Sequence, residues 1–214
     1  MSNTFYFNRT DAKWGVDITH SISTNKTLYT YGVESHRSRN LSFKPRWNIG
    51  KNFIANVLLH SELDELITPP IDNQAYSVSE REMEPSVSYI YKTNFRLTLS
   101  YDYYDKINSE GYKDKAINNA MIADVKYNVL SNSTIDVHFA FNSINYNSDS
   151  TGSANTTVGY TILNGLVPGA NYLWTISYTK RLTGNIEMSL EYDGRKTGSE
   201  DIINTGRASV RAIF

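Results

Sequence analysis

The chain has 214 residues, a formal net charge of −1 and no cysteine, and its mean hydropathy is −0.45. The lack of cysteine excludes disulfide and thiol chemistry, and a balanced charge without a long Lys/Arg run argues against nucleic-acid binding. No apolar run approaches the roughly 18 residues that a transmembrane helix needs. The remaining way for such a chain to cross a bilayer is a closed β-barrel. Its strands alternate apolar and polar residues, so the hydropathy averaged along each strand is low.

In chain order, the alternation of apolar and polar residues predicts eleven strands, with a weaker one before them at Thr4–Asn8. Strands of about ten residues suit a tilted membrane span, whereas strands of soluble proteins average about half that length. The eleven predicted strands are Trp14–Ser23, Lys26–Ser35, Leu41–Gly50, Asn52–Glu62, Met83–Lys92, Phe95–Asp105, Asn119–Leu130, Thr134–Asn145, Asn171–Leu182, Asn185–Arg195 and Asn204–Phe214.

The connections between these strands alternate between short and long. The predicted short turns are Thr24-Asn25, Gly50–Asn52, Thr93-Asn94, Ser131–Ser133 and Thr183–Asn185. The predicted long connections are His36–Asn40, Leu63–Glu82, Lys106–Asn118, Tyr146–Ala170 and Lys196–Ile203. Outer-membrane barrels have short periplasmic turns and long extracellular loops, so the alternation favours an up-and-down transmembrane barrel of about 12 strands.

One face of each predicted strand is apolar, as in the set Phe95, Leu97, Leu99, Tyr101 and Tyr103. Aromatic residues, which make up 13% of the chain, fall near both strand ends and predict two girdles at the membrane interfaces. The alternatives are a soluble β-sandwich, which buries its apolar faces between two sheets, and a lipocalin-like barrel, which turns them inward around a ligand.

The opposite face of the predicted strands carries charge. Glu187, Glu191 and Asp193 lie on one strand, and Arg207 and Arg211 lie on its predicted neighbour, so ion pairs between the two strands are expected. The same face carries further charges at Lys44, Arg46, Arg96, Asp124 and Lys126. Acids and bases are nearly balanced, so these residues predict either a salt-bridged interior that holds the barrel together or the lining of a small hydrophilic channel.

The sequence predicts no catalytic, cofactor-binding or metal-binding residue. His20 falls on the predicted lipid face, but no serine is predicted close enough to act with it as a catalytic pair. An enzyme like the outer-membrane phospholipases is therefore a minority alternative. His60 and His138 face inward, and His36 is predicted in a loop. The acidic stretch Glu62–Glu65 lacks the ligand spacing of an EF-hand calcium loop.

One connection has an unusual composition. Gly165–Asn171 combines two glycines and a proline with apolar residues, and Tyr160–Leu166 is too apolar for a mobile external loop. This segment is expected to be structured, and several interpretations remain open: a loop that folds over or into the barrel mouth and constricts it, a surface that docks a partner, and simple packing of the loop.

The last residues alternate in the same way, with Val210, Ala212 and Phe214 on one face and Arg207 and Arg211 on the other. Together with the segment from Gly165 onward, they resemble the carboxy-terminal strands of large bacterial outer-membrane barrel proteins. This resemblance implies insertion by the β-barrel assembly machinery, which recognises a terminal aromatic residue. In this chain the implied assembly signal is Phe214. It implies no catalytic residues.

The sequence therefore predicts a single domain over residues 1–214, located in the bacterial outer membrane and in contact with its lipid and lipopolysaccharide. Its role is expected to be a small pore or a membrane-embedded scaffold subunit with other envelope proteins; the alternatives are a barrel enzyme and a soluble all-β binding module. No nucleic acid or cofactor is expected. Because Met1–Thr4 begins without a signal peptide, a mature chain, a refolded form and part of a longer protein all remain open.

Overall fold

A computed structural model describes residues 1–8, 12–30, 32–68, 75–129, 132–150, 153–183 and 185–212. Phe214, the predicted assembly signal, lies outside the described residues. The strands are β1 (Ser2–Phe7), β2 (Trp14–Tyr29), β3 (Gly32–Ile49), β4 (Phe53–Ile67), β5 (Tyr76–Tyr91), β6 (Phe95–Asn108), β7 (Asp114–Val129), β8 (Ser133–Ser148), β9 (Gly169–Thr183), β10 (Ile186–Thr197) and β11 (Ile203–Ala212). The short helices η1 (Ser153–Asn155) and α1 (Thr157–Ile162) lie between β8 and β9.

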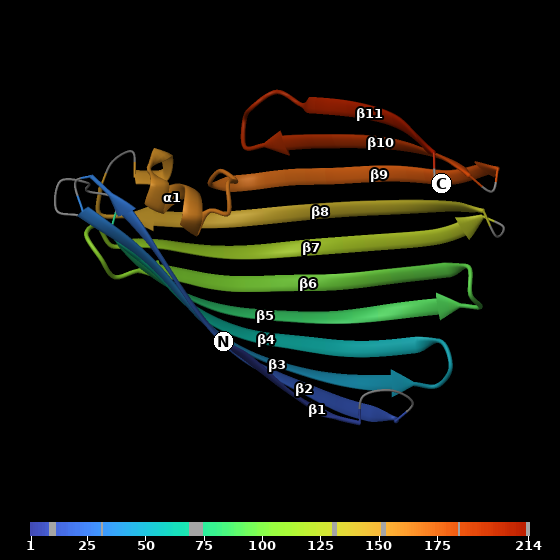
Figure 1. Ribbon diagram of the computed structural model, residues 1–214, viewed down its shortest axis with the longest axis horizontal. Helices are drawn as coiled ribbons and strands as arrows, with labels where there is room; N and C mark the ends of the chain where they lie inside the picture. The colour runs from blue at the N-terminus through green and yellow to red at the C-terminus, as the bar shows by residue number, and fades with distance from the viewer. Residues whose placement is uncertain are drawn as a thin grey trace.

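The strands form one eleven-stranded sheet in which each strand pairs with its sequence neighbours, in the order β1 to β11 (Figure 1). Every pairing is antiparallel. The all-β, up-and-down architecture predicted from the sequence is confirmed. In the part of the chain that the structure describes, no helix is long and apolar enough to span a membrane.

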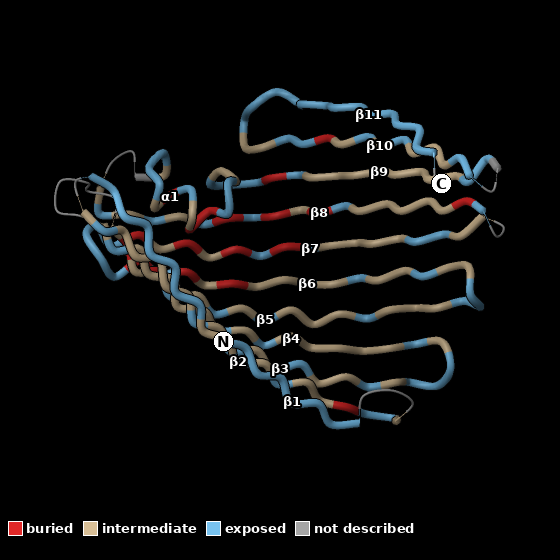
Figure 2. The backbone as a smooth tube through the Cα atoms, viewed as in Figure 1, coloured by how far each residue is buried: buried red, intermediate tan, exposed pale blue. Residues whose placement is uncertain are grey.

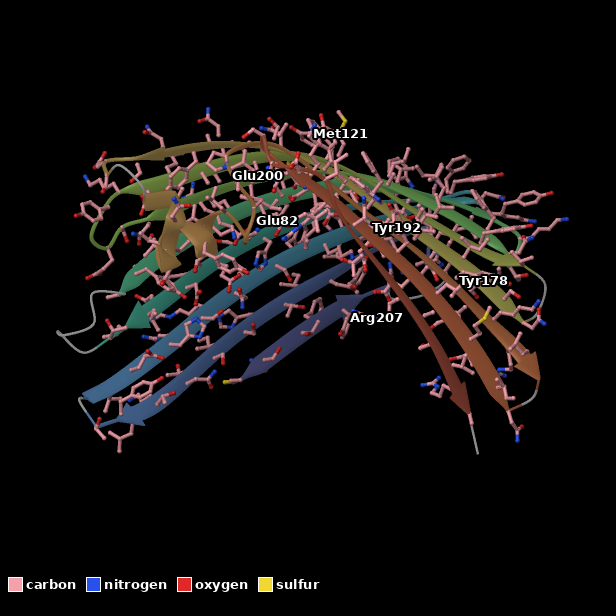
Figure 3. The ribbon with its side chains drawn as sticks, turned by 90° about the horizontal axis from the view of Figure 1, so that it is seen from above. Glu82, Met121, Tyr178, Tyr192, Glu200 and Arg207 are labelled. Atoms are coloured by element: carbon pink, nitrogen blue, oxygen red, sulfur yellow. The ribbon has the colours of Figure 1, made fainter. Side chains whose placement is uncertain are left out.

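The sheet is bent into an arch, with α1 on its concave side (Figure 3). We call the end of the sheet that carries α1 the loop end, and the opposite end, where residues 50–52 and 92–94 connect strands, the turn end (Figure 1). Both outermost strands, β1 and β11, are exposed along their whole length.

The predicted turn at Thr24-Asn25 is wrong. Both residues lie inside β2, where they pair with Arg37 and His36 of β3, so the predicted loop His36–Asn40 is also strand. Thr24 is β-branched and favours an extended backbone, whereas Gly32, with φ of 147°, follows the real connection directly. Three predicted strands are therefore two long ones, and the sheet has eleven strands instead of about 12.

This correction also changes the pattern of connections. Because β2 ends at Tyr29 and β3 begins at Gly32, the connection between them at the loop end is short, and short and long connections do not alternate without exception. Several strands also extend further toward the loop end than predicted: β4 continues to Ile67 and β5 begins at Tyr76, inside the predicted loop Leu63–Glu82. These extensions pair with each other, as Leu66 does with Tyr76.

The two faces of the sheet have opposite character, as predicted. The register aligns residues of one kind across the sheet, as in the row Val87, Leu99, Ala123, Phe139 and Trp174. This convex face is apolar and exposed: the exposed fraction is 53% for Leu99 and 64% for Met121, which projects from the convex side in Figure 3. A lipocalin-like barrel or a sandwich would bury these side chains, so the soluble alternatives are not supported.

Aromatic side chains form a belt on the convex face at the turn end. The rings of Phe53, Tyr89, Phe95 and Tyr127 follow one another across four strands, with centroids 5.0 to 6.4 Å apart. Phe141 and Tyr172 contact each other at 5.0 Å nearer the loop end, where Tyr101 and Tyr192 also lie on this face. Aromatic rings in two bands, with aliphatic residues between them, suit the two interfaces of a bilayer.

Candidate functional site

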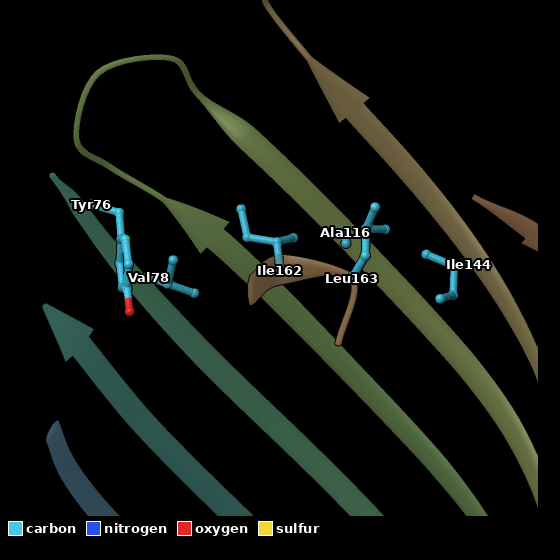
Figure 4. Close-up of a cluster of buried hydrophobic side chains, with 6 residues drawn as sticks. All are labelled: Tyr76, Val78, Ala116, Ile144, Ile162 and Leu163. Atoms are coloured by element: carbon cyan, nitrogen blue, oxygen red, sulfur yellow. The ribbon is translucent and has the colours of Figure 1, made fainter. Parts of the chain in front are cut away.

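Buried residues gather at the loop end, beneath α1, on the concave face (Figure 2). Ile162 and Leu163, at the end of α1, are fully buried. The strand residues that they contact share the concave face and come from three strands: Tyr76, Val78, Ala116 and Ile144 (Figure 4). The apolar segment predicted around Tyr160–Leu166 therefore folds against the inner wall, as expected for a loop that folds inward; docking of a partner stays a prediction.

Local structure prepares this segment for docking. The hydroxyl of Thr156 caps α1 by accepting a hydrogen bond from the Gly159 backbone N–H at 3.1 Å. After the helix, Asn164 and Gly165 have φ of 53° and 73°, a backbone conformation that reverses the chain direction at low cost for these residue types. The reversal leaves Ile162 and Leu163 facing the sheet.

Two polar anchors hold the segment in place. The buried Lys106 ammonium on β6 donates to Asn164 Oδ1 at 2.7 Å and forms an ion pair with Glu80 on β5 at 3.0 Å. At the other end of the segment, the buried Asn171 amide donates to the Val167 carbonyl at 2.8 Å and to the Gly169 carbonyl at 3.1 Å. Because both anchors are buried, the segment belongs to the folded wall.

Histidine and acidic residues line the concave face beside α1. His36 is not in a loop as predicted; it lies on β3, with Nε2 2.6 Å from the Asp64 carboxylate. The Tyr76 hydroxyl donates to the same carboxylate at 3.2 Å. Burial, together with the Asp64 charge, raises the pKa of Tyr76 to about 12, so this tyrosine remains a donor at neutral pH. The predicted acidic loop Glu62–Glu65 is part of β4.

The loop-end half of the concave face is acidic. Its carboxylates come from four neighbouring strands: Glu34, Glu62, Asp64, Glu80, Glu82, Glu84 and Asp102. Glu82 points into this concave region in Figure 3, and Lys106 is the buried cation beside it. Acids and bases are nearly balanced over the whole face, as predicted from the sequence. Their separation along the strands was not predicted, because it depends on the register between strands.

The turn-end half of the concave face carries the predicted charge network. Arg211 donates to Glu187 at 2.9 Å and Arg207 to Glu191 at 3.4 Å, and the Lys126 ammonium lies 3.4 Å from Asp136. The remaining predicted members are placed as follows: Asp193 accepts from Thr175 at 2.7 Å, Asp124 contacts His138 at 2.7 Å, and Arg46 donates to the Asn8 carbonyl at 2.9 Å. Lys44 and Arg96 lie on the same face without an ion-pair partner in the described part of the chain.

The arginines of β11 are only weakly enclosed. The exposed side-chain fraction is 71% for Arg207 and 70% for Arg211, because β11 is an outermost strand. Most of the basic residues at this end (Lys44, Arg46, Arg96 and Lys126) lie on interior strands. The concave face therefore has an acidic loop-end half and a mixed, base-rich turn-end half.

The geometry does not assemble a phospholipase-like site around His20. This residue lies on the convex face, where its Cα partners across the strands are Asn3 and Leu41. No group of three or more His, Asp or Glu within the described ranges is arranged to hold a metal ion.

No family model and no curated protein matches the chain. Among solved structures, a loop L8 deletion mutant of OmpT, an outer membrane protein of Vibrio cholerae, aligns with a TM-score of 0.65 at 8% identity, over 99% of this chain and 62% of the other. In-vitro folded OmpT of Vibrio cholerae aligns with a TM-score of 0.50 at 6% identity, over 98% and 91% of the two chains. A NanC porin aligns at only 0.43, with 10% identity over 100% and 98%.

The chain thus spans 62% of the length of the first of these proteins. At these identities the likeness concerns the fold, and it agrees with the convex apolar face, the aromatic belts and the up-and-down topology described above. The chain has the fold of the bacterial outer-membrane β-barrel proteins.

Proposed function

We propose that this chain forms the wall of a water-filled pore in the bacterial outer membrane. The observation that carries the proposal is the inward-folded segment. The connection between β8 and β9 packs Ile162 and Leu163 on the inner wall, and charged residues lie on that wall from the loop end to the turn end. A lipid-facing convex side and a polar concave side are what a membrane channel needs.

The segment and the separated charges define how such a pore works. A segment anchored inside the wall narrows the passage and limits solute size. Carboxylates at the loop end attract cations to the mouth, and the bases beyond them favour anionic groups. Because the two halves of the wall differ in charge, the current is expected to depend on the sign of the applied voltage.

Conductance in planar bilayers tests the proposal. The wild-type chain should produce steady channels whose current rectifies. Leu163→Asp places a charge in the buried cluster, releases the segment and should raise single-channel conductance. Thr157→Asp adds the same charge at an exposed position of the same helix, and its conductance should equal that of the wild type.

The outcomes separate the parts of the proposal. Folded wild-type protein without any conductance would contradict the pore. Conductance that is equal in the wild type and in Leu163→Asp would keep the pore but contradict the role of the segment as its constriction.

A scaffold role is the second candidate, and a different observation favours it. β1 and β11 are exposed along their whole length, and exposed strand edges are surfaces for pairing with another chain. The scaffold would be favoured over the pore if the chain does not conduct but co-purifies with other envelope proteins. Pro substitutions in β11 should then abolish the co-purification.

A further inference from the structure

The convex face changes from apolar to basic at one level of β3 and β5. On β3 the convex positions run from Trp47 to Leu41 and then continue with Arg39 and Arg37 toward the loop end. On β5 they run from Tyr91 to Met83 and continue with Arg81. The arginines therefore occupy the first convex positions past the apolar band.

The register brings Arg39 and Arg81 to either side of β4. Arg81 lies directly opposite Ser61, and Arg39 lies opposite Leu63, the next convex residue of β4. With strands about 4.8 Å apart and a two-residue offset of about 6.8 Å along the strands, the two Cα positions are separated by about 12 Å. Both arginines are exposed, and their side chains are long enough to approach a ligand that lies over β4.

Among the residues that the structure describes, the nearby carboxylates do not form ion pairs with Arg39 or Arg81. Asp105, opposite Arg81 on β6, pairs with Lys115 at 3.2 Å. Glu65 lies opposite Arg37, further from the apolar band. Neither Arg39 nor Arg81 has an ion-pair partner within the described ranges. On β8 the convex positions past the apolar band are Ser143 and Asn145, so the basic character does not extend to β8.

We propose that Arg39 and Arg81 bind a lipid whose headgroup carries two phosphate groups, in the leaflet at the loop end. The inference rests on the proposed membrane location. The level just past the apolar band is that of the lipid headgroups. Guanidinium groups bind phosphate through paired hydrogen bonds, and the Ser61 hydroxyl adds a donor between them. Two guanidiniums whose Cα atoms lie about 12 Å apart match two phosphates on one headgroup better than a single phosphodiester.

Native mass spectrometry of the detergent-solubilised chain tests the site. The probes are diphosphorylated lipid A, monophosphorylated lipid A and phosphatidylglycerol. The wild type should retain the diphosphorylated lipid at least tenfold more tightly than the other two. Arg39→Gln with Arg81→Gln should lose this preference, whereas Arg207→Gln with Arg211→Gln removes two arginines from the concave face and should keep it.

Equal retention of the three lipids by the wild type, or an unchanged preference in the Arg39→Gln, Arg81→Gln variant, would overturn the lipid site. The same variant should conduct like the wild type in bilayers of zwitterionic lipid. Loss of the lipid preference with normal conductance supports the site, while a wild type that binds the lipid but never conducts contradicts only the pore.

Discussion

The assignment of the convex face to the lipid depends most directly on its leucine residues. Leu99 and Leu190 lie on the convex face between the aromatic belts, and Ser100 and Ser189 are their concave neighbours. Leu99→Arg or Leu190→Arg should destabilise the barrel by about 2–4 kcal/mol, because a guanidinium near mid-membrane is poorly solvated. Ser100→Arg and Ser189→Arg, the matched controls, should cost clearly less. Urea titration in vesicles measures both pairs, and equal costs would contradict the assignment of the faces.

The buried pair Lys106 and Glu80 should be far more sensitive than a surface ion pair. Their exposed side-chain fractions are 7% and 15%, so removing one partner leaves an uncompensated buried charge. Lys106→Met should destabilise the protein by about 3–5 kcal/mol, and adding Glu80→Gln should recover part of that loss. Equilibrium unfolding measures the recovery; a double variant less stable than Lys106→Met would contradict the pairing.

The pairs between β10 and β11 should behave in the opposite way. From sequence, Glu187 and Glu191 with Arg207 and Arg211 are expected to be partly buried in a confined interior, but the arginines are mostly exposed. Their coupling should therefore be about 0.2–1 kcal/mol for each pair. A double-mutant cycle on Glu187 and Arg211 measures it, and a coupling of several kcal/mol would mean that β11 is covered in the membrane.

At the level of elements, the alternation of residue types was sufficient to predict which face of each strand is apolar, because a period of two survives small errors at strand ends. The ends themselves were not predictable. Thr24-Asn25 looks like a turn in isolation, and only the ladder between β2 and β3 reveals that both residues are paired. Likewise, Tyr160–Leu166 was recognised as structured, but its docking site depends on residues of three distant strands.

The continuity of β2 and β3 can be tested directly. Asn25 and His36 are Cα partners in the ladder, whereas a turn at Thr24-Asn25 would place them at opposite ends of a strand. Because the chain has no cysteine, Asn25→Cys with His36→Cys has no competing thiols and should form a disulfide on oxidation. Mass spectrometry detects the bond, and two persistent free thiols would restore the predicted turn.

At the scale of the whole molecule, the direction of the outermost strands limits how a barrel closes. β1 and β11 both run from the loop end to the turn end, because the sheet has an odd number of strands. Open edges are not tolerated in lipid. An antiparallel closure therefore needs an odd number of additional strands between β11 and β1, from this polypeptide or from another.

We expect such additional strands to separate the two edges. Thr4→Cys with Ser209→Cys should then fail to cross-link within one chain in native membranes. The pair Ser189→Cys with Ser209→Cys, which are Cα partners on neighbouring strands, provides the positive control. An efficient cross-link between positions 4 and 209 would mean that β1 and β11 close the barrel in parallel.

The most direct test of a water-filled pore with a lipid-facing outer wall is a single-cysteine scan along β6 in lipid vesicles. A charged, water-soluble thiol reagent should modify Thr98→Cys, Ser100→Cys and Asp102→Cys rapidly, and it should spare Leu97→Cys, Leu99→Cys and Tyr101→Cys. Reactivity without a period of two, or protection of both sets, would contradict a polar, water-filled concave side and an apolar convex side in lipid.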